Sequence, residues 1–334
     1  MRIAFTSCCD PINDPVQSAW KIVAAKKPQH LVLLGDNIYM DYGFGDHLGN
    51  GKPKGLPPAA FSALMHGCYA RQWAVPAFRK AIAGVAVHAI WDDHDFAWNK
   101  ARGGGPVAPE DRFYVPASHR KISRRLFQQF REALIAQPNV YPPNPCPLEQ
   151  VVDLGSIETQ IQLEPGLTLH LLDGRTFREA VDRSASMLGV PQRDRVSMLG
   201  LPQRNKLNSN LLDAPGINLL ASGSTLKDWE RFSDFKWLEE ASKQKRLLVL
   251  SGDIHKPAFR KPGAFFRRGE GNWFEATASA MGQPPKITGW IGKKQGVFGL
   301  LDVNPTELDI TLWHEDEQVG RYVIDRTAWT LRSS

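Results

Sequence analysis

Cysteine is scarce in this sequence of 334 residues, and the way it is spaced excludes a scaffold built on disulfides. The four cysteines, Cys8, Cys9, Cys68 and Cys146, form no CxxC pair and are too few for a disulfide framework. Cys8 and Cys9 are adjacent and could bridge each other only through a strained ring. We therefore expect at least one of them to stay a thiol.

Long hydrophobic runs are also missing. No apolar run reaches the length of a transmembrane helix, and the N-terminal stretch MRIAFTSCCD lacks an apolar segment of secretory-signal length. We therefore expect a soluble, cytoplasmic protein. Hydrophobic residues make up 42% of the chain and charged residues 23%, which is the balance of a globular protein.

A long basic block is absent as well, although the formal net charge is +6. The nearest approach to one is Arg120-Lys121 with Arg124-Arg125, at helical spacing. We interpret this group as a solvated helix face, with attraction of anionic substrates such as phosphate esters as the alternative. The sequence shows no dedicated nucleic-acid-binding module, and it leaves the oligomeric state open.

Short apolar runs alternate with helical patterns over most of the chain. We expect strands at Arg2–Ser7, His30–Gly35, Val85–Trp91, Leu167–Leu172 and Arg246–Gly252. We expect helices at Pro15–Lys26, Ala59–Ile82, Ser118–Ala136 and Leu226–Gln244. This alternation predicts an α/β core. After Asn272, strand-like runs follow one another without helices, which predicts an antiparallel sheet or edge that closes the same domain.

One short repeat stands out. SMLGVPQRDRV (Ser186–Val196) is followed directly by SMLGLPQRNKL (Ser197–Leu207). Two copies are too few for a solenoid. We interpret the repeat as a tandem duplication within a surface excursion; the alternative is an extended loop that faces the substrate.

Each expected strand ends on a group that can bind a metal ion or an anion. These groups are Ser7-Cys8-Cys9-Asp10, Asp36, Asp92-Asp93-His94-Asp95, Asp173 with Arg175, and Asp253 with His255. In open α/β sheets ligands bind at the carboxyl ends of the strands, so parallel strands would gather these side chains. Clustered carboxylates repel one another unless cations compensate them. The mixture of carboxylate, imidazole, thiol and phenol fits transition metals or zinc, beside a harder ion.

Each residue taken alone has an ordinary structural explanation. A single Asp after a strand usually forms a turn, Tyr39 would be an amphipathic core residue, and Cys8 a small buried hydrophobe. The run Asp92-Asp93-His94-Asp95 has no ordinary packing explanation, which favours a functional site there.

These motifs resemble the PhoD-like alkaline phosphatases of the calcineurin-like metallophosphoesterase superfamily. The matching elements are TSC (Thr6–Cys8), LGDNIY (Leu34–Tyr39), WDDHD (Trp91–Asp95), LDGRTFR (Leu172–Arg178), SMLGVPQ (Ser186–Gln192) and SGDIH (Ser251–His255). The resemblance implies an α/β fold, a four-layer αββα sandwich. We expect a single domain over residues 1–334, with an insertion around residues 180–225.

The resemblance also implies a pair of metal ions, with ligands from Cys8, Asp36, Tyr39, Asp93, Asp253 and His255. Asp36 would bridge the ions, and Tyr39 would bind an iron(III) ion. The family is associated with Fe³⁺ and Ca²⁺, and Mn²⁺ or Zn²⁺ are possible substitutes. Whether Cys8, Cys9 or Asp10 ligates stays open at this point.

The remaining roles concern the substrate. By resemblance, Arg175 would bind the phosphoryl oxygens, His94 would contact phosphate and protonate the leaving group, and Asn99 would face the substrate. The function predicted is hydrolysis of phosphomonoesters, phosphodiesters or both, by attack of a metal-bound hydroxide. The alternatives are a phosphodiesterase specific for lipid or nucleic-acid diesters, and a catalytically silent phosphate- or nucleotide-binding protein.

Overall fold

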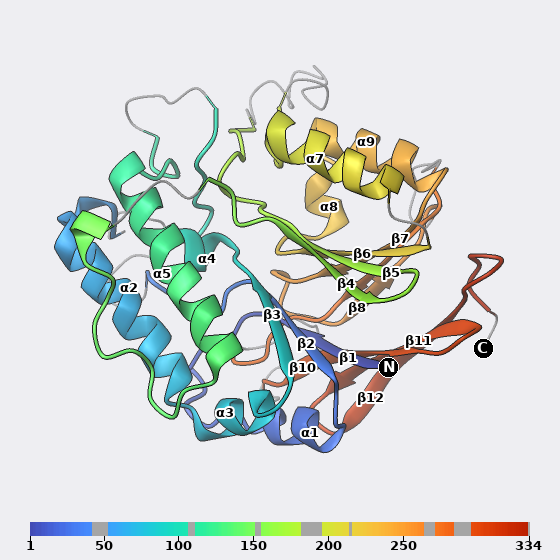
Figure 1. Cartoon of the computed structure of the whole chain (residues 1–334), viewed down its shortest axis with the longest axis horizontal. Coiled ribbons are helices and arrows are strands. Elements are labelled where there is room, and N and C mark those ends of the chain that lie inside the picture. The colour runs from blue at the N-terminus through green and yellow to red at the C-terminus, as the bar shows by residue number, and fades with distance from the viewer. Residues whose placement is uncertain are drawn as a thin grey trace.

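The computed structural model describes residues 1–41, 53–105, 111–150, 155–181, 196–213, 216–263, 271–283 and 295–332. The described strands form two six-stranded sheets that lie face to face, with helices on both outer sides (Figure 1). These four layers confirm the αββα sandwich predicted from the sequence.

The first sheet combines three parallel strands with an antiparallel end. Its strand order is β12 (Glu317–Asp325), β11 (Glu307–His314), β10 (Val297–Val303), β1 (Arg2–Thr6), β2 (His30–Leu34) and β3 (Ala86–Ile90). The strands β1, β2 and β3 run parallel, and Phe5 lies opposite Val32 in the register. The last three strands add to β1 as an antiparallel meander. The antiparallel edge expected after Asn272 is therefore confirmed.

The second sheet is mostly parallel. Its order is β4 (Thr159–Glu164), β5 (Leu167–Leu171), β6 (Ile217–Ser222), β7 (Arg246–Ser251), β9 (Trp273–Thr277) and β8 (Ala258–Arg260). The parallel strands β5, β6, β7 and β9 are buried along their length. Such strands read as continuous apolar runs because helices or the other sheet cover both their faces.

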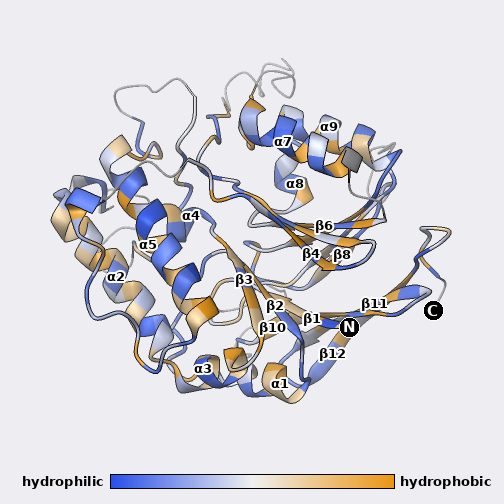
Figure 2. Ribbon diagram, viewed as in Figure 1, coloured by the Kyte–Doolittle hydropathy of each residue, from blue (hydrophilic) through white to orange (hydrophobic). Residues whose placement is uncertain are grey.

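Two groups of helices cover the outer faces of the sheets (Figure 1). The described α-helices are α1 (Ala19–Ala25), α2 (Pro58–Trp73), α3 (Pro76–Ile82), α4 (Asp93–Phe96), α5 (Ala117–Ala136), α7 (Gly200–Asp213), α8 (Leu226–Trp229) and α9 (Ser233–Ser242). The first sheet is flanked by α1, α2, α3 and α5, and the second by α7, α8 and α9. Figure 2 shows hydrophobic strands between helices with hydrophilic outward faces.

Two expected helices are interrupted in the structure. The segment 59–82 is split at Val75, which is extended because the ring of Pro76 disfavours the helical conformation in the residue before it. The segment 226–244 is split at Phe232, which has an extended backbone and a fully buried side chain. Both corrections are local, since α2 and α3 both flank the first sheet, and α8 and α9 both flank the second.

The hydrophobic residues form two cores. The larger lies between the two sheets and extends to α1, α2, α3 and α5; it includes the fully buried Trp20, Trp91 and Trp98. The smaller lies between the second sheet and α7, α8 and α9, around Trp229. Burial of large side chains on this scale is the main favourable term in folding. Within the described ranges, no helix is both long enough and apolar enough to cross a bilayer.

The second copy of the SMLG repeat belongs to the smaller core. Met198 and Leu199 are fully buried, and the Ser197 hydroxyl donates to the buried Asp234 carboxylate at 3.0 Å. Gln203 is buried at the start of α7 and bonds the backbone of Asp173 in both directions. The surface excursion expected here is therefore wrong for the second copy. The first copy, Ser186–Val196, lies outside the described residues except for Val196.

Candidate metal centre and active site

The carboxyl ends of parallel strands from both sheets point toward one place. The residues that follow these strands there have unusual backbone conformations. Cys8, Asp36, Asp253 and His255 all have positive φ, at 61°, 50°, 70° and 52°. Non-glycine residues rarely adopt this region, and each such position costs on the order of 1 kcal/mol or more. Four of them directly after β1, β2 and β7 indicate that the fold retains strain to aim these side chains.

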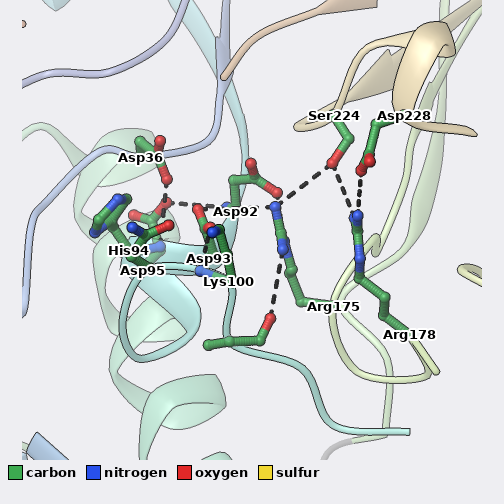
Figure 3. Close-up of polar contacts among 12 residues, drawn as sticks. Asp36, Asp92, Asp93, His94, Asp95, Lys100, Arg175, Arg178, Ser224 and Asp228 are labelled. Atoms are coloured by element: carbon green, nitrogen blue, oxygen red, sulfur yellow. Dashed lines mark hydrogen bonds and ion pairs between the residues drawn. The ribbon is translucent and has the colours of Figure 1, made fainter. Parts of the chain in front are cut away.

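Four carboxylates meet at this point. Oxygen atoms of Asp36, Asp92, Asp93 and Asp253 all lie within 4.8 Å of one another, and a ring nitrogen of His94 joins Asp36 and Asp93 within the same limit. Figure 3 shows the side chains of Asp36, Asp92 and Asp93 gathered at this point, with Arg175 between Asp92 and Ser224. The acidic residues that follow β2, β3 and β7 therefore lie together, whereas the Asp173 carboxylate, after β5, bonds Trp91 and Ser156.

The electrostatics of this cluster fit a cation site. Burial, with the neighbouring thiol of Cys8, holds the pKa of Asp36 well above its usual range. Burial and the charges of Asp92 and Asp93 raise the pKa of Asp253 to about 7. Asp92 Oδ2 and Asp93 Oδ1 are buried and accept no hydrogen bond from the described residues. Buried carboxylate oxygens without donors are costly, and a bound cation would satisfy them.

Cys8 contacts this cluster through its side chain, whereas Cys9 contacts it through its backbone N–H, which donates to the carbonyl of Asp36. The Cys8 thiol donates to Asp36 Oδ2 at 3.4 Å and lies 3.2 Å from Ser279 Oγ. Burial raises the pKa of Cys8 to about 11, against hydrogen bonds from Ser279, Ser7 and Tyr39. Cys9 packs in the larger core. The Asp10 carboxylate accepts hydrogen bonds from the turn at Ile12 and Asn13 and from Gln283.

Tyr39 and His255 lie beside the cluster. The centroid of the Tyr39 ring is 4.2 Å from that of the His94 ring, and the Tyr39 hydroxyl lowers the pKa of the Cys8 thiol. The His255 backbone N–H donates to Ser279 Oγ at 3.0 Å, the hydroxyl that also contacts Cys8. The described groups of histidine, cysteine and carboxylate ligand atoms within 4.8 Å of one another include neither His255 nor Cys8.

His94 is held by a carboxylate that the sequence interpretation did not single out. His94 Nδ1 lies 2.7 Å from Asp41 Oδ1, and Asp41 Oδ2 accepts the backbone N–H of Asn99 at 3.0 Å. Although burial lowers it, the charges of Asp36, Asp41 and Asp93 raise the pKa of His94 to about 10. Cations bound at Asp36 and Asp93 would offset these charges and lower that pKa again. The Asn99 side chain is exposed at the cleft.

Arg175 faces the cluster from the second sheet. Its Nε donates to Asp92 Oδ1 at 2.6 Å, and Nη2 lies 3.7 Å from Asp93 Oδ1. Although burial raises it, Arg175 and then His94 hold the pKa of Asp93 well below its usual range. Two glycines fix the segment Arg175–Arg178, which follows β5. The N–H groups of Gly103 and Gly104 donate to the carbonyls of Arg175 and Arg178. A Cβ on Gly104 would overlap the carbonyl of Phe177.

The cluster opens into a cleft of about 700 Å³. Its floor includes Asp93, Arg175 and Asp253, and Arg178 lines one wall. Arg178 donates to Ser224 Oγ at 3.0 Å and pairs with Asp228 (Figure 3). Sequence reasoning missed Asp41, Ser279 and Asp228 as parts of the site, and it gave Asp92 no separate role within the run Asp92–Asp95. Asp41 lies two residues after the motif LGDNIY (Leu34–Tyr39), so its proximity to that motif could have flagged it.

This sandwich, with carboxylates, a histidine and an arginine at the strand ends, defines the class of metallophosphoesterases. Within that class, the chain belongs to the PhoD-like phosphatase family, whose sequence profile matches residues 3–216. As a member of this family it is a hydrolase that acts on phosphoric esters.

Comparison with solved structures agrees on the fold. A structure of PhoD superimposes with a TM-score of 0.69 at 16% identity, covering 99% of this chain and 71% of that one. A protein of Thermus thermophilus gives a TM-score of 0.39 at 11% identity, covering 100% and 97%. A conserved uncharacterised Streptococcus pneumoniae protein, predicted to be a phosphoesterase, gives 0.33 at 9%, covering 97% of both. The latter two scores are too low to support an argument. No curated protein matches the sequence.

Proposed function

We propose that the chain is a metal-dependent phosphoesterase that hydrolyses phosphomonoesters, phosphodiesters or both at the cleft above Asp36, Asp93 and Asp253. The observation that carries the proposal is the cluster of four carboxylates within 4.8 Å, two of whose buried oxygens lack a donor among the described residues. Like charges are not gathered in this way unless cations compensate them.

The residues that would hold the cations are Asp36, Asp93, Asp253 and Cys8, with Tyr39 and His255 beside them. A bound pair of cations would supply an activated water nucleophile and neutralise the charge of the phosphoryl group. A thiol and a phenol beside carboxylates favour a trivalent or soft ion at one position, and oxygen donors alone suit a harder ion at the other. Because the family that the chain resembles is associated with iron and calcium, we propose Fe³⁺ and Ca²⁺, with Mn²⁺ or Zn²⁺ as substitutes.

The chain's own residues position the ester and handle one proton. The Arg175 guanidinium is buried and faces Asp93, so its planar fork would bind the phosphoryl oxygens. His94, anchored at Nδ1 by Asp41, would donate a proton from Nε2 to the leaving oxygen. Asn99 fixes Asp41 through its backbone, and its side chain lies at the cleft for contact with the substrate.

The proposal is tested by Asp36→Asn and Asp253→Asn. Each change removes one negative charge from the cluster, so metal content by mass spectrometry and hydrolysis of p-nitrophenyl phosphate should fall together, the latter by more than about a hundredfold. The matched control is Asp316→Asn, an exposed residue in the turn between β11 and β12, which should change neither. Full metal content or full turnover in either cluster variant would contradict the proposal.

Two further functions are separated by the same assays. A phosphodiesterase specific for lipid or nucleic-acid diesters would prefer bis-p-nitrophenyl phosphate to p-nitrophenyl phosphate. A catalytically silent binding protein would bind phosphate without hydrolysing either ester across several metals. A visible spectrum of the purified protein adds the metal identity, because iron(III) bound to Tyr39 would give a charge-transfer band that Tyr39→Phe abolishes.

A further inference from the structure

The cleft above the carboxylates extends well beyond the floor at which one phosphoryl group would bind. It encloses about 700 Å³, and its walls come from both halves of the sandwich. One wall follows α4 and includes Lys100 and Phe113, and the other contains α8 and includes Lys227 and Phe232. A substrate larger than a bare phosphate would therefore contact both walls.

Most of the positive charges in this cleft are already compensated within the protein. Arg102 pairs with Asp111, and Arg178 and Arg231 both pair with Asp228. Arg175 pairs with Asp92 on the floor. The described Glu179 carboxylate, also in the cleft, accepts the backbone N–H of Ser197 at 2.5 Å.

Lys100 and Lys227 differ from these arginines. Both are exposed and line the cleft, and neither forms an ion pair with a carboxylate of the described residues. The Lys100 ammonium lies 5.9 Å from the centroid of the Phe113 ring. Two uncompensated ammonium groups, one on each wall above an anion-binding floor, raise the local concentration of anions and can each form a charge-assisted hydrogen bond.

We propose that Lys100 and Lys227 form a second anion-binding subsite, which selects substrates that carry another phosphate group beyond the one that is hydrolysed. The proposal rests on the proposed function for its floor, and it adds the substrate class: esters with at least two phosphate groups. The second phosphate could belong to a nucleotide or to a chain of phosphodiesters, since the lysines recognise only the charge.

The test uses two chromogenic esters that differ by one phosphate. These are thymidine 5′-(p-nitrophenyl phosphate) and the same compound with a 3′-phosphate. The wild-type enzyme should hydrolyse the 3′-phosphorylated ester with a kcat/KM about tenfold or more above that of the other ester. Each lysine should contribute a factor of roughly three to ten to this ratio. In the double variant Lys100→Gln, Lys227→Gln this ratio should fall to within about threefold of one. The wild-type ratio should also shrink as salt is raised.

The matched control removes the same two charges elsewhere. Lys21 on α1 and Lys80 on α3 are exposed and lie outside the cleft residues, so Lys21→Gln, Lys80→Gln should keep the wild-type ratio. A wild-type enzyme without preference, or a cleft variant that keeps it, would overturn the proposal.

A failure of the proposed function would look different. If neither ester is hydrolysed, calorimetric titration with thymidine 5′-phosphate and thymidine 3′,5′-bisphosphate measures the same preference as binding. Tighter binding of the bisphosphate, lost in the cleft variant and kept in the control, would support the subsite without turnover. Equal binding of both nucleotides by the wild-type protein would reject it.

Discussion

At the scale of single residues, Asp41 has two effects on His94 that a substitution can separate. Its negative charge favours the protonated imidazole, and its hydrogen bond orients the ring. Asp41 Oδ1 accepts from His94 Nδ1 at 2.7 Å, and its second oxygen accepts the backbone N–H of Asn99. An asparagine at position 41 would keep an acceptor for Nδ1 and lose the negative charge that favours the protonated imidazole. The ring would stay oriented but would hold its proton less firmly.

We therefore expect Asp41→Asn to lower kcat by about 10- to 100-fold, which is part of the roughly 10²- to 10⁴-fold that general acid catalysis typically contributes. Because protonation matters most for poor leaving groups, the loss should be larger with phenyl phosphate than with p-nitrophenyl phosphate. Metal content should stay at the wild-type value, which separates this variant from Asp36→Asn. Equal losses with both esters would mean that Asp41 acts only through the position of the ring.

The residues of the site show how far sequence reasoning reaches at this scale. Asp36, Asp93 and Asp253 could be predicted to meet because each directly follows an apolar strand, and parallel strands end on one edge. Ser279 could not, because it lies after β9, which was not predicted as a separate strand. Its contact with Cys8 depends on how the second sheet packs against the first, and no local pattern records that packing.

At the scale of secondary structure, a histidine pair joins two neighbouring strands. His30 on β2 and His88 on β3 stack, with Nδ1 of the first 3.1 Å from Nε2 of the second, so at least one nitrogen must be unprotonated. Burial, then the charges of His30 and Arg131, lower the pKa of His88 to about 4. Burial also lowers the pKa of His30.

A pKa that is lowered in the folded state means that the unfolded chain binds protons first. The free energy of unfolding should therefore be unaffected by the pair above pH 6.5. As the pH falls from 6.5 to about 4, protonation of the pair should lower the free energy of unfolding by up to about 3 kcal/mol. In His88→Gln, which keeps a hydrogen-bonding group, the difference in unfolding free energy between pH 7 and pH 4.5 should shrink by about 2 kcal/mol. Urea denaturation at both pH values measures it, and the titrating carboxylates elsewhere are common to both proteins. An unchanged pH dependence would show that the pair tolerates protonation.

The elements themselves could be predicted in proportion to how local their signals are. The five expected strands are all present, because each is an apolar run with a clear polar end. The strand β6, which lies at the centre of the second sheet, was missed, because INLLAS (Ile217–Ser222) lies inside the segment around residues 180–225 that was assigned to an insertion. The breaks at Val75 and Phe232 depend on one proline and on one aromatic side chain that the smaller core buries.

At the scale of the whole molecule, the candidate centre joins the two halves of the sandwich. Cys8 and Asp36 follow strands of the first sheet, and Asp253 follows β7 of the second. Cations bound between them would cross-link the sheets at one edge, and their removal would leave the carboxylates to repel one another across the same interface. The metal ions would therefore stabilise the fold as well as take part in the reaction.

Removal of the metal ions by chelation should lower the melting temperature by about 5–10 °C, because ions bound at a thousandfold excess over their dissociation constant contribute about 4 kcal/mol. The direction in which Asp253→Asn changes the melting temperature, with and without metal, then distinguishes metal coordination from simple packing. Without metal, Asp253→Asn should melt at or above the wild-type temperature, because it removes one of the repelling charges; with metal, it should melt below, because it loses a ligand. Asp316→Asn should follow the wild type in both states. If Asp253→Asn melts below the wild type by the same amount with and without metal, Asp253 serves packing alone, and the two sheets are not joined by ions.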